Sequence, residues 1–600
     1  MSISFDAIKI NGQFYETTAP DTLDLTDRAR LALNVLTANP DPRNSYRLWQ
    51  SMQFNTSPPH LSGPNWLTYK FLESLPMMRV MCGDNFNLGS ERDMMQAHLD
   101  RIADDGLVYE PPGTSSFMRD EGASPFTNGR FILAMLAWHQ RDGVDAWLDR
   151  VDRMNRALAT IAVYRRNYAF HPPEAVYAPN IGWLYTHRSG TAFFPYMPPD
   201  EPSRDQQGIE GTIKENAHVL RAAVRWYEIS GDPEALDYAR KLANFFLLPS
   251  FWEDGAAEGI VGYEHGLFAG HFHGNTGGLR ALLRLAIVTR DESLKQFVRE
   301  SYEFALRSGL PRIGWFPTWL CPERFGRSPF LRTVCEGCGI ADMVALAIKL
   351  SDAGVRDCWD DVDQYVRNQL VEQQGIDPEL LQAASRHGQP FVSHSATTST
   401  VRVLERSLGA FSGFGEPTCL PHADFHGCCT GNGTQALYYA WEAISRFQDG
   451  TAQINLLLNR AAPWVDIDSY LPFQGKVVVH NKQASALSIR IPGWVDRGGL
   501  SCSVSSRPVT PYWAGNYVLL TGLRPRDHVT LEFRVPEEAA TYTAAGVTYH
   551  CTFRGSTLVD VAPRNIVSGS YPLYRREVLR SPLAAMKTKQ RYVADAAIRW

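Results

Sequence analysis

The sequence has few cysteines, no cluster of basic residues and no long apolar run, and each shortage excludes a class of protein. Ten cysteines in 600 residues are too sparse for a disulfide scaffold. The net charge of -5 comes without a block rich in lysine and arginine, so we expect no nucleic-acid partner. No stretch resembles a membrane span, and no signal-peptide pattern follows Met1–Asp6. We expect a protein of a reducing compartment, the cytoplasm, without a membrane partner.

The composition is that of an ordered globular chain. Hydrophobic residues make up 44% of the sequence and aromatic residues 11%, which allows a core of ample size. Because 600 residues exceed the usual length of one domain, we expect more than one.

The first three quarters of the chain carry the apolar spacing of helices. Apolar residues recur at i, i+3, i+4, i+7 and i+8 in several segments, among them 219–227, 279–287 and 340–348. The first segment is followed by Gly231-Asp232-Pro233, a stop and restart signal, and then by an amphipathic pattern over 235–246. Helix pairs recurring roughly every 60 residues predict a closed toroid of paired helices, with a stack of open solenoid repeats as the alternative.

The pattern changes near Asp449-Gly450. Leu487, Ile489 and Ile491 alternate with polar residues, and the same period of two covers 529–535. Such alternation, punctuated by glycine and proline, is typical of strands. We therefore expect a multidomain α + β protein, with a helical catalytic domain over residues 1–450 and a β-sandwich region, as one or two small sandwiches, over 451–600.

Two short segments hold the cysteines that carry chemistry. Cys335-Glu336-Gly337-Cys338 and Cys428-Cys429 each stand just before an apolar helical pattern. Thiolates and carboxylates are ligands that zinc takes in tetrahedral sites. The partial positive charge at a helix N-terminus also lowers the pKa of a nearby thiol. The sequence therefore predicts a zinc-thiolate site, gathered where the N-termini of the inner helices of a toroid converge.

The same cysteines allow a second interpretation. Cys335, Cys338, Cys428 and Cys429 could form a closed structural zinc site with Glu336 outside it, and spacing alone favours this arrangement. The choice between a catalytic and a structural zinc stays open at the level of residue spacing.

The motifs resemble those of the β-L-arabinofuranosidases of glycoside hydrolase family 127. Glu336-Gly337-Cys338, followed by Cys428-Cys429 before a helix, is similar to the cysteine motifs of that family. Glu323-Arg324-Phe325-Gly326 resembles its Glu-x-Phe-Gly segment, and Ile489–Trp494 resembles a strand of its β-sandwich. The resemblance spans Asn128–Pro536 and implies an (α/α)6 barrel followed by β-sandwich domains.

The resemblance also implies roles for individual residues. Zinc would be held by Glu336, Cys338, Cys428 and Cys429, with Cys428 as the nucleophile and Glu323 as the general acid/base of a retaining hydrolase. Two histidines are candidates for substrate binding. Ala217-His218 resembles the family's Gly-His helix start, and His273-Gly274-Asn275-Thr276 is similar to the His-Ala-Asn-Thr of a related arabinofuranosidase family. The implied substrates are L-arabinofuranosides or similar sugars, cleaved from a chain end.

Three functions compete on this sequence. The first is the retaining glycosidase, and the second is another zinc enzyme in which the metal activates a substrate thiol or water. The third is a carbohydrate-binding protein with a structural zinc. Glu323 discriminates the first two, because only the glycosidase needs a carboxylate opposite the nucleophile. The sugar, the linkage and the oligomeric state are left open, with a homodimer among the alternatives.

Overall fold

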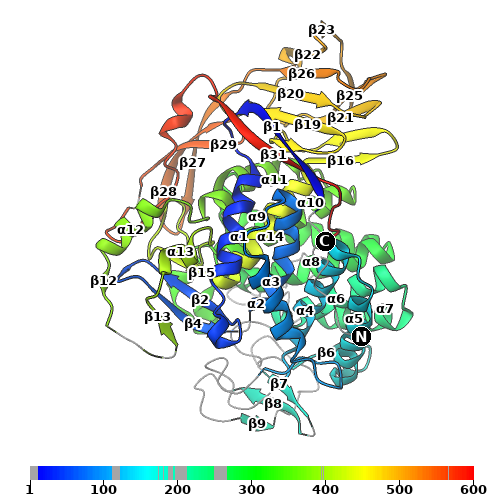
Figure 1. Cartoon of the computed structure of the whole chain (residues 1–600), viewed down its shortest axis with the longest axis vertical. Coiled ribbons are helices and arrows are strands. Elements are labelled where there is room, and N and C mark those ends of the chain that lie inside the picture. Colours follow the sequence, from blue (N-terminus) through cyan, green and yellow to red (C-terminus); the bar gives the residue numbers. More distant parts are fainter. Residues whose placement is uncertain are drawn as a thin grey trace.

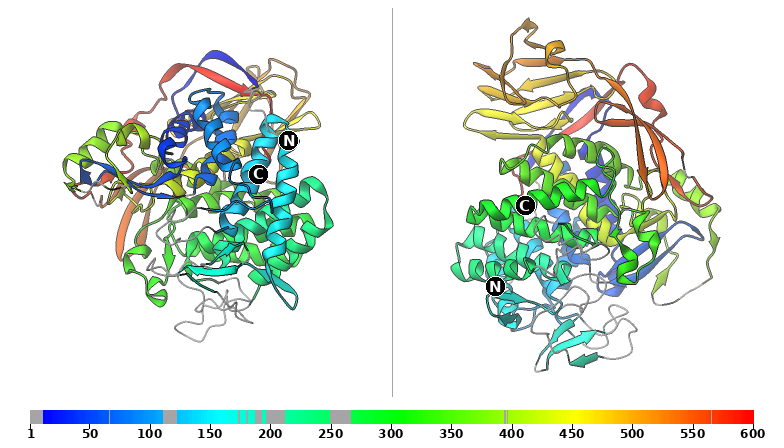
Figure 2. Two further views of the ribbon diagram at one scale, coloured as in Figure 1. Left: turned by 60° about the horizontal axis from the view of Figure 1, so that its bottom comes forward. Right: turned by 180° about the vertical axis from the view of Figure 1, so that it is seen from behind.

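The computed structural model describes residues 11–65, 67–110, 122–172, 175–179, 181–186, 193–195, 212–248, 267–392, 395, 397–564 and 566–600. Helices occupy the middle of the chain, and a strand-rich part covers one end of them (Figures 1 and 2). No helix among these residues is long and apolar enough to cross a membrane.

Six helices form a closed inner ring. Each contacts the next and the last contacts the first, in the order α2 (Thr68–Cys82), α4 (Pro125–Asp142), α6 (Thr212–Ser230), α8 (Phe272–Thr289), α10 (Gly337–Asp352) and α14 (Gly427–Ile444). Every residue of α2 is buried, as expected for a helix enclosed on all sides. The predicted helical barrel is confirmed, and its ring is closed rather than an open stack.

A second set of helices packs outside this ring. These helices alternate along the chain with the inner ones and are α1 (Leu25–Ala38), α3 (Leu88–Leu99), α5 (Ala146–Ile161), α7 (Pro233–Phe246), α9 (Glu292–Arg307) and α11 (Trp359–Tyr365). They are amphipathic: α9 buries Leu294, Val298 and Tyr302 toward α8 and exposes its other face. The amphipathic pattern over 235–246 corresponds to α7, which Asp232 caps through a bond from the Glu234 amide and which Pro233 begins.

Small residues let neighbouring inner helices approach closely. A Cβ atom at Gly129 of α4 would lie 2.8 Å from the Val219 nitrogen of α6. A Cβ atom at Gly431 of α14 would lie 2.5 Å from Cβ of Lys70 in α2. Glycine at these two places therefore permits the ring to close around a narrow interior.

The two largest sheets begin directly after the last inner helix. A five-stranded sheet follows the order β16 (Ser445–Gln448), β17 (Thr451–Ile454), β21 (Ala486–Arg490), β25 (Tyr517–Thr521) and β24 (Tyr512–Ala514). A six-stranded sheet follows the order β18 (Arg460–Ala461), β19 (Val465–Ser469), β20 (Lys476–Asn481), β26 (His528–Glu532), β22 (Ser501–Val504) and β23 (Arg507–Pro508). The expected alternation is present, because Leu487 and Ile489 of β21 are buried, as are Val529 and Leu531 of β26.

The two ends of the described chain meet in one pair of strands. β1 (Gly12–Pro20) pairs antiparallel with β31 (Met586–Ala594) along its whole length, and it also contacts β19. A three-stranded antiparallel sheet follows the six-stranded sheet in sequence and precedes β31; its strands are β27 (Glu537–Ala544), β28 (Val547–Arg554) and β29 (Thr557–Ala562). Residues before the barrel thus take part in the strand-rich part, and the division into domains at residue 450 stays a prediction.

Candidate active site

Three inner helices begin at the same place in the barrel. His271 precedes α8, Glu336 precedes α10 and His426 precedes α14, each at the N-cap position. Because α8, α10 and α14 are neighbours in the ring, the two cysteine segments meet there. The expected convergence of the inner-helix N-termini is found.

Three cysteines form a tight group at this position. Sγ of Cys338 lies 3.6 Å from Sγ of Cys429, and Sγ of Cys428 lies 3.8 Å from Sγ of Cys429. All three sulfurs lie within 4.8 Å of one another. Cys338 and Cys429 are buried, whereas Cys428 is only partly buried. Of the three thiols, that of Cys428 is therefore the most accessible to a ligand.

The spacing of the sulfurs fits a tetrahedral zinc ion. Zinc–sulfur bonds of about 2.3 Å at a tetrahedral centre place two sulfurs about 3.8 Å apart. The separations of 3.6 Å between Cys338 and Cys429 and of 3.8 Å between Cys428 and Cys429 are close to this value. The donor set of soft sulfurs also suits zinc better than magnesium or calcium.

The electrostatic environment singles out Cys428 as the thiolate. Hydrogen bonds from the thiols of Cys338 and Cys429, and from His426, hold the pKa of Cys428 well below its usual value. Burial instead raises the pKa of Cys338 and of Cys429 well above the usual range. Without metal, the negative charge therefore rests on Cys428, which the other two thiols stabilise by donating to it.

His426 is itself held by a carboxylate. Its Nε2 lies 3.0 Å from Oδ2 of Asp424, and the other carboxylate oxygen, Oδ1, accepts a 2.8 Å hydrogen bond from Oγ of Ser51. Although burial opposes the imidazolium, Asp424 and Cys428 raise the pKa of His426 well above its usual value. A cationic ring thus stands beside the Cys428 thiolate.

Two further residues contact the thiols, and the sequence analysis did not identify them. Nε2 of Gln50 donates to Sγ of Cys428 over 3.1 Å, from β2 (Leu48–Gln53), which pairs with β15 (Asp424–His426) just ahead of α14. Nζ of Lys70 lies 4.0 Å from Sγ of Cys338 and is buried on α2. The sequence does contain one indication of a role for Lys70, because it is a charged residue within a largely apolar helical segment. No comparable signal marks Gln50.

Glu336 lies beside the thiols but is not a member of their group. Among the residues that the structure describes, the group holds the three cysteines alone. Oε1 of Glu336 is 2.7 Å from Nε2 of His271. Burial would raise the pKa of Glu336, but His271, which lies within hydrogen-bond distance, lowers it, so the carboxylate is ionised. Its assignment as the fourth zinc ligand stays a prediction.

Cys335 does not belong to the group of three sulfurs and has hydrogen-bond partners of its own. Its Sγ accepts a 2.7 Å hydrogen bond from Nε2 of Gln373, and its backbone pairs with Gly415. Burial raises the pKa of the Cys335 thiol far above its usual value. Cys335 is thus a neutral, buried thiol, and the structure does not gather four cysteines into a closed site.

Glu323 lies on the turn Pro322–Phe325, next to the same mouth. β11 (Trp319–Leu320) leads into this turn and pairs with β10 (Gly270–His271), and the turn also contacts β10. The Glu323 carboxylate is exposed and pairs with Arg332 at 2.8 Å, not with the adjacent Arg324. Because β10 ends at His271, which pairs with Glu336, the turn that carries Glu323 contacts the strand that leads to this pair. The catalytic role of Glu323 stays a prediction.

The two histidines predicted to bind substrate lie inside the ring. Nδ1 of His273 is 2.6 Å from Oδ2 of Asp342, and its Nε2 is 3.4 Å from Nδ2 of Asn432. The ring of His218 meets that of Phe126 edge-on at 4.6 Å. Burial lowers the pKa of both histidines, so each is neutral.

Buried ion pairs tie the interior of the ring together. Arg130 of α4 pairs with Glu73 of α2 at 2.6 Å and also donates to Asn432 of α14. Arg221 of α6 reaches the same Glu73 at 3.6 Å. These contacts join four of the six inner helices below the thiols and give the barrel a polar interior.

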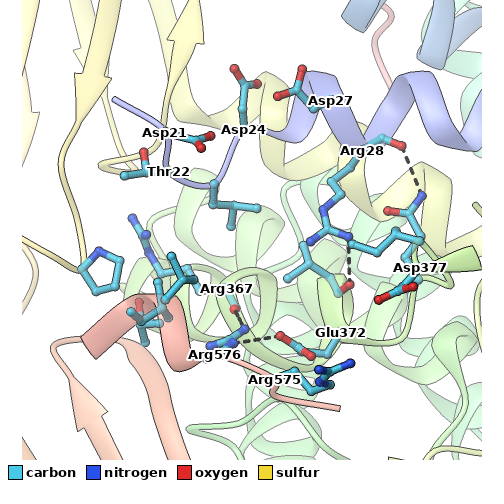
Figure 3. Close-up of a pocket in the computed structure, with 18 of the residues that line it drawn as sticks. Asp21, Thr22, Asp24, Asp27, Arg28, Arg367, Glu372, Asp377, Arg575 and Arg576 are labelled. Atoms are coloured by element: carbon cyan, nitrogen blue, oxygen red, sulfur yellow. Dashed lines mark hydrogen bonds and ion pairs between the residues drawn. The ribbon is translucent and has the colours of Figure 1, made fainter. Parts of the chain in front are cut away.

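The cavity shown in Figure 3 lies apart from this site. It has a volume of about 600 Å³ and lies between the start of α1 and the segment 571–579. Arg576 pairs there with Glu372 at 2.8 Å, and Arg28 donates to the Val371 carbonyl. None of the predicted catalytic, zinc-binding or substrate-binding residues lines it.

No protein-family model and no curated protein matches the sequence. Solved structures match in fold. A glycoside hydrolase family 127 β-L-arabinofuranosidase from Geobacillus stearothermophilus T6 has a TM-score of 0.55 and 14% identity over 96% of this chain and 94% of its own. A second β-arabinofuranosidase of that family has a TM-score of 0.55 and 15% identity, over 89% of this chain and 79% of its own. The resemblance to family 127 is confirmed in fold.

Proposed function

We propose that the protein is a retaining glycoside hydrolase that uses the Cys428 thiolate as its nucleophile and zinc as its cofactor. The observation that carries this proposal is the group of three sulfurs at the mouth of the barrel, in which the most accessible thiol also has the lowered pKa. The fold shared with family 127 arabinofuranosidases supports it.

Cys338, Cys428 and Cys429 would hold the zinc, with Glu336 as the proposed fourth ligand. When bound, zinc keeps coordinated thiolates deprotonated and fixes their orientation. Gln50 and His426 contact Cys428 from the protein side and restrict where its sulfur can point. The sulfur thus enters the reaction as a charged and oriented group.

In the proposed reaction, Sγ of Cys428 attacks the anomeric carbon of the sugar. The carbon–oxygen bond to the leaving group breaks as Glu323 gives its proton to the departing oxygen. A water molecule, deprotonated by Glu323, then attacks the same carbon and displaces the Cys428 sulfur. Two displacements at one carbon give net retention. In this scheme the Glu323 carboxyl group leaves its ion pair with Arg332 and contacts the leaving oxygen instead.

The buried histidines are suited to bind sugar hydroxyls. With Asp342 accepting from Nδ1 of His273, the Nε2 atom of that ring is an acceptor, and in this proposal a sugar hydroxyl replaces its long 3.4 Å contact with Nδ2 of Asn432. His218, on the neighbouring helix, is neutral as well. We propose L-arabinofuranosides or similar sugars, removed from a chain end, as the substrates, because the fold is that of enzymes described as arabinofuranosidases.

The two competing functions have less support. The structural zinc site of four cysteines needs Cys335 as a ligand, yet Cys335 is bonded to Gln373 and lies outside the sulfur group. No observation favours a zinc enzyme that acts on another kind of substrate. No disulfide joins any of the ten cysteines, which is compatible with the proposed cytoplasmic location.

The test is turnover of a panel of aryl glycosides, including both arabinofuranoside anomers, by protein of measured zinc content. We expect release of aryl alcohol by the wild type and not by Cys428→Ser. Turnover by both proteins would remove Cys428 from the mechanism. Zinc-loaded protein without turnover on any glycoside would favour the structural-zinc or non-glycosidase alternatives.

A further inference from the structure

A second cavity lies at the opposite end of the barrel from the thiols. It has a volume of about 170 Å³ and is lined by the C-terminal halves of α6, α8 and α10, with Trp600 over it. Lys349, which lines it, follows Cys338 by eleven residues on α10, or about 16 Å along the helix axis. The two sites are therefore separate.

The lining of this cavity carries more positive than negative charge. Four cations line it, Arg221, Arg280, Arg284 and Lys349, against two carboxylates, Glu228 and Asp352. Neither carboxylate belongs to the cavity alone, because Glu228 is shared with Arg225 and Asp352 pairs with Arg446. Among the lining side chains the cations therefore outnumber the carboxylates by two.

The four cations differ in how they are paired. Arg280 bonds to Asp342 at 2.7 Å and Arg221 reaches Glu73, so both are held from the interior of the barrel. Nε of Arg284 donates to Glu228 over 2.8 Å. Among the described residues, the ammonium group of Lys349 makes no hydrogen bond or ion pair, and its Nζ instead lies 3.9 Å above the Trp600 ring. Of the four cations, Lys349 is thus the one without an ion pair among the described residues, although the more distant carboxylates of Asp352 and Glu442 act on it.

The pKa values of two of these groups reflect the crowding of like charges. Burial and the nearby Arg284 lower the pKa of Lys349 to about 8. Burial, together with Arg225 and Arg221, lowers the pKa of Arg284 to about 9. An anion placed between the two groups would offset both effects.

We propose that this cavity binds a small oxyanion, held by Lys349 and Arg284. A volume of about 170 Å³ corresponds to roughly five or six water molecules at about 30 Å³ each. That space accommodates a phosphate, a sulfate or a short carboxylate and excludes a nucleotide or an oligosaccharide. The side chains of Leu283, Ile287 and Leu346 form an apolar wall, so a carboxylate with a short alkyl group also fits.

The test is calorimetric titration of the zinc-loaded protein with inorganic phosphate, sulfate and acetate, each against sodium chloride at equal ionic strength. We expect saturable binding of at least one oxyanion and not of chloride. The order of the three affinities distinguishes a phosphate-type from a carboxylate-type ligand. Absence of saturable binding for all three would overturn the proposal.

Two variants locate the site. Lys349→Met removes the charge without leaving a carboxylate unpaired, so it should fold and should bind the oxyanion at least tenfold more weakly. Lys349→Arg should retain binding. Lys241→Met is the matched control, because it removes one positive charge from the outer helix α7, where Lys241 pairs with Asp237. Equal binding by Lys349→Met and Lys241→Met would show that the anion binds elsewhere.

Discussion

Sγ of Cys338 lies 3.6 Å from Sγ of Cys429, although 91 residues separate them in sequence. The contact exists because α10 and α14 are neighbours in the ring and both begin at the same end of the barrel. The next contact around the ring, from α14 to α2, brings Lys70 to the same place. The site therefore depends on closure of the whole ring rather than on one loop.

The first prediction concerns the reactivity of the thiols without metal. In chelator-treated protein, iodoacetamide should modify Cys428 faster than Cys338 or Cys429, because Cys428 is partly accessible and has the lowered pKa. Stoichiometric zinc should slow modification of Cys428 by at least tenfold. Mass spectrometry of peptides measures both rates. Exposed Cys321 supplies the internal control, since zinc should not change its rate; an equal slowing at Cys321 would contradict a specific site.

The second prediction separates Cys335 from the zinc ligands. Cys335→Ala should keep stoichiometric zinc and activity, because its thiol is bonded to Gln373 and lies outside the sulfur group. Loss of that contact, which leaves the Gln373 amide without its acceptor, should lower the free energy of unfolding by about 1–3 kcal/mol. Cys338→Ala is the comparison and should lose zinc. Loss of metal from Cys335→Ala would restore the four-cysteine structural site.

The third prediction tests Glu323 as the general acid/base. Glu323→Gln should retain folding and zinc while turnover falls by about 10²–10⁴-fold, the usual contribution of a positioned proton donor. A suitable control is Glu537→Gln, because Glu537 is likewise an exposed glutamate paired with an arginine, Arg554, but lies on β27. Steady-state kinetics on an aryl glycoside compare the two. Turnover by Glu323→Gln at the rate of the control would remove Glu323 from the mechanism.

Much of the fold could be predicted because its elements have strong periodicity. The apolar spacing over 279–287 and 340–348 identifies α8 and α10, and the alternation over 487–491 identifies β21. The pairing of β1 with β31 could not be predicted, since the first half of β31 is largely exposed and shows little apolar alternation. Because β1 and β31 lie at opposite ends of the sequence, no turn or local sequence pattern indicates that they pair.

The site was predictable only where adjacent residues carry the chemistry. The resemblance of the motifs around Cys338 and Cys428-Cys429 to family 127 implies these three sulfurs, whereas residue spacing alone also included Cys335. Gln50 lies 378 residues from Cys428 and reaches it through the β2–β15 pairing. A single glutamine on a short strand has no distinguishing pattern, so only the tertiary structure reveals its contact.

The last prediction concerns the acid stability that Asp342 confers. Although burial opposes ionisation, His273 and Arg280 hold the pKa of Asp342 far below its usual value of about 3.9. Its contribution is therefore complete above pH 5 and is lost as the pH falls, because the unfolded chain binds the proton first. Asp342→Asn should unfold more easily at pH 7, since Arg280 loses its partner. Its unfolding free energy should also fall less between pH 5 and 3, by about 1.2 kcal/mol in total, because the limiting slope of about 1.4 kcal/mol per pH unit for one proton is reached only below the unfolded pKa of about 3.9. Urea unfolding of metal-free protein measures both effects without a contribution from zinc release. Asp237→Asn, at an exposed ion pair, is the control, and a slope in Asp342→Asn equal to that of the control would show that Asp342 does not carry the acid dependence.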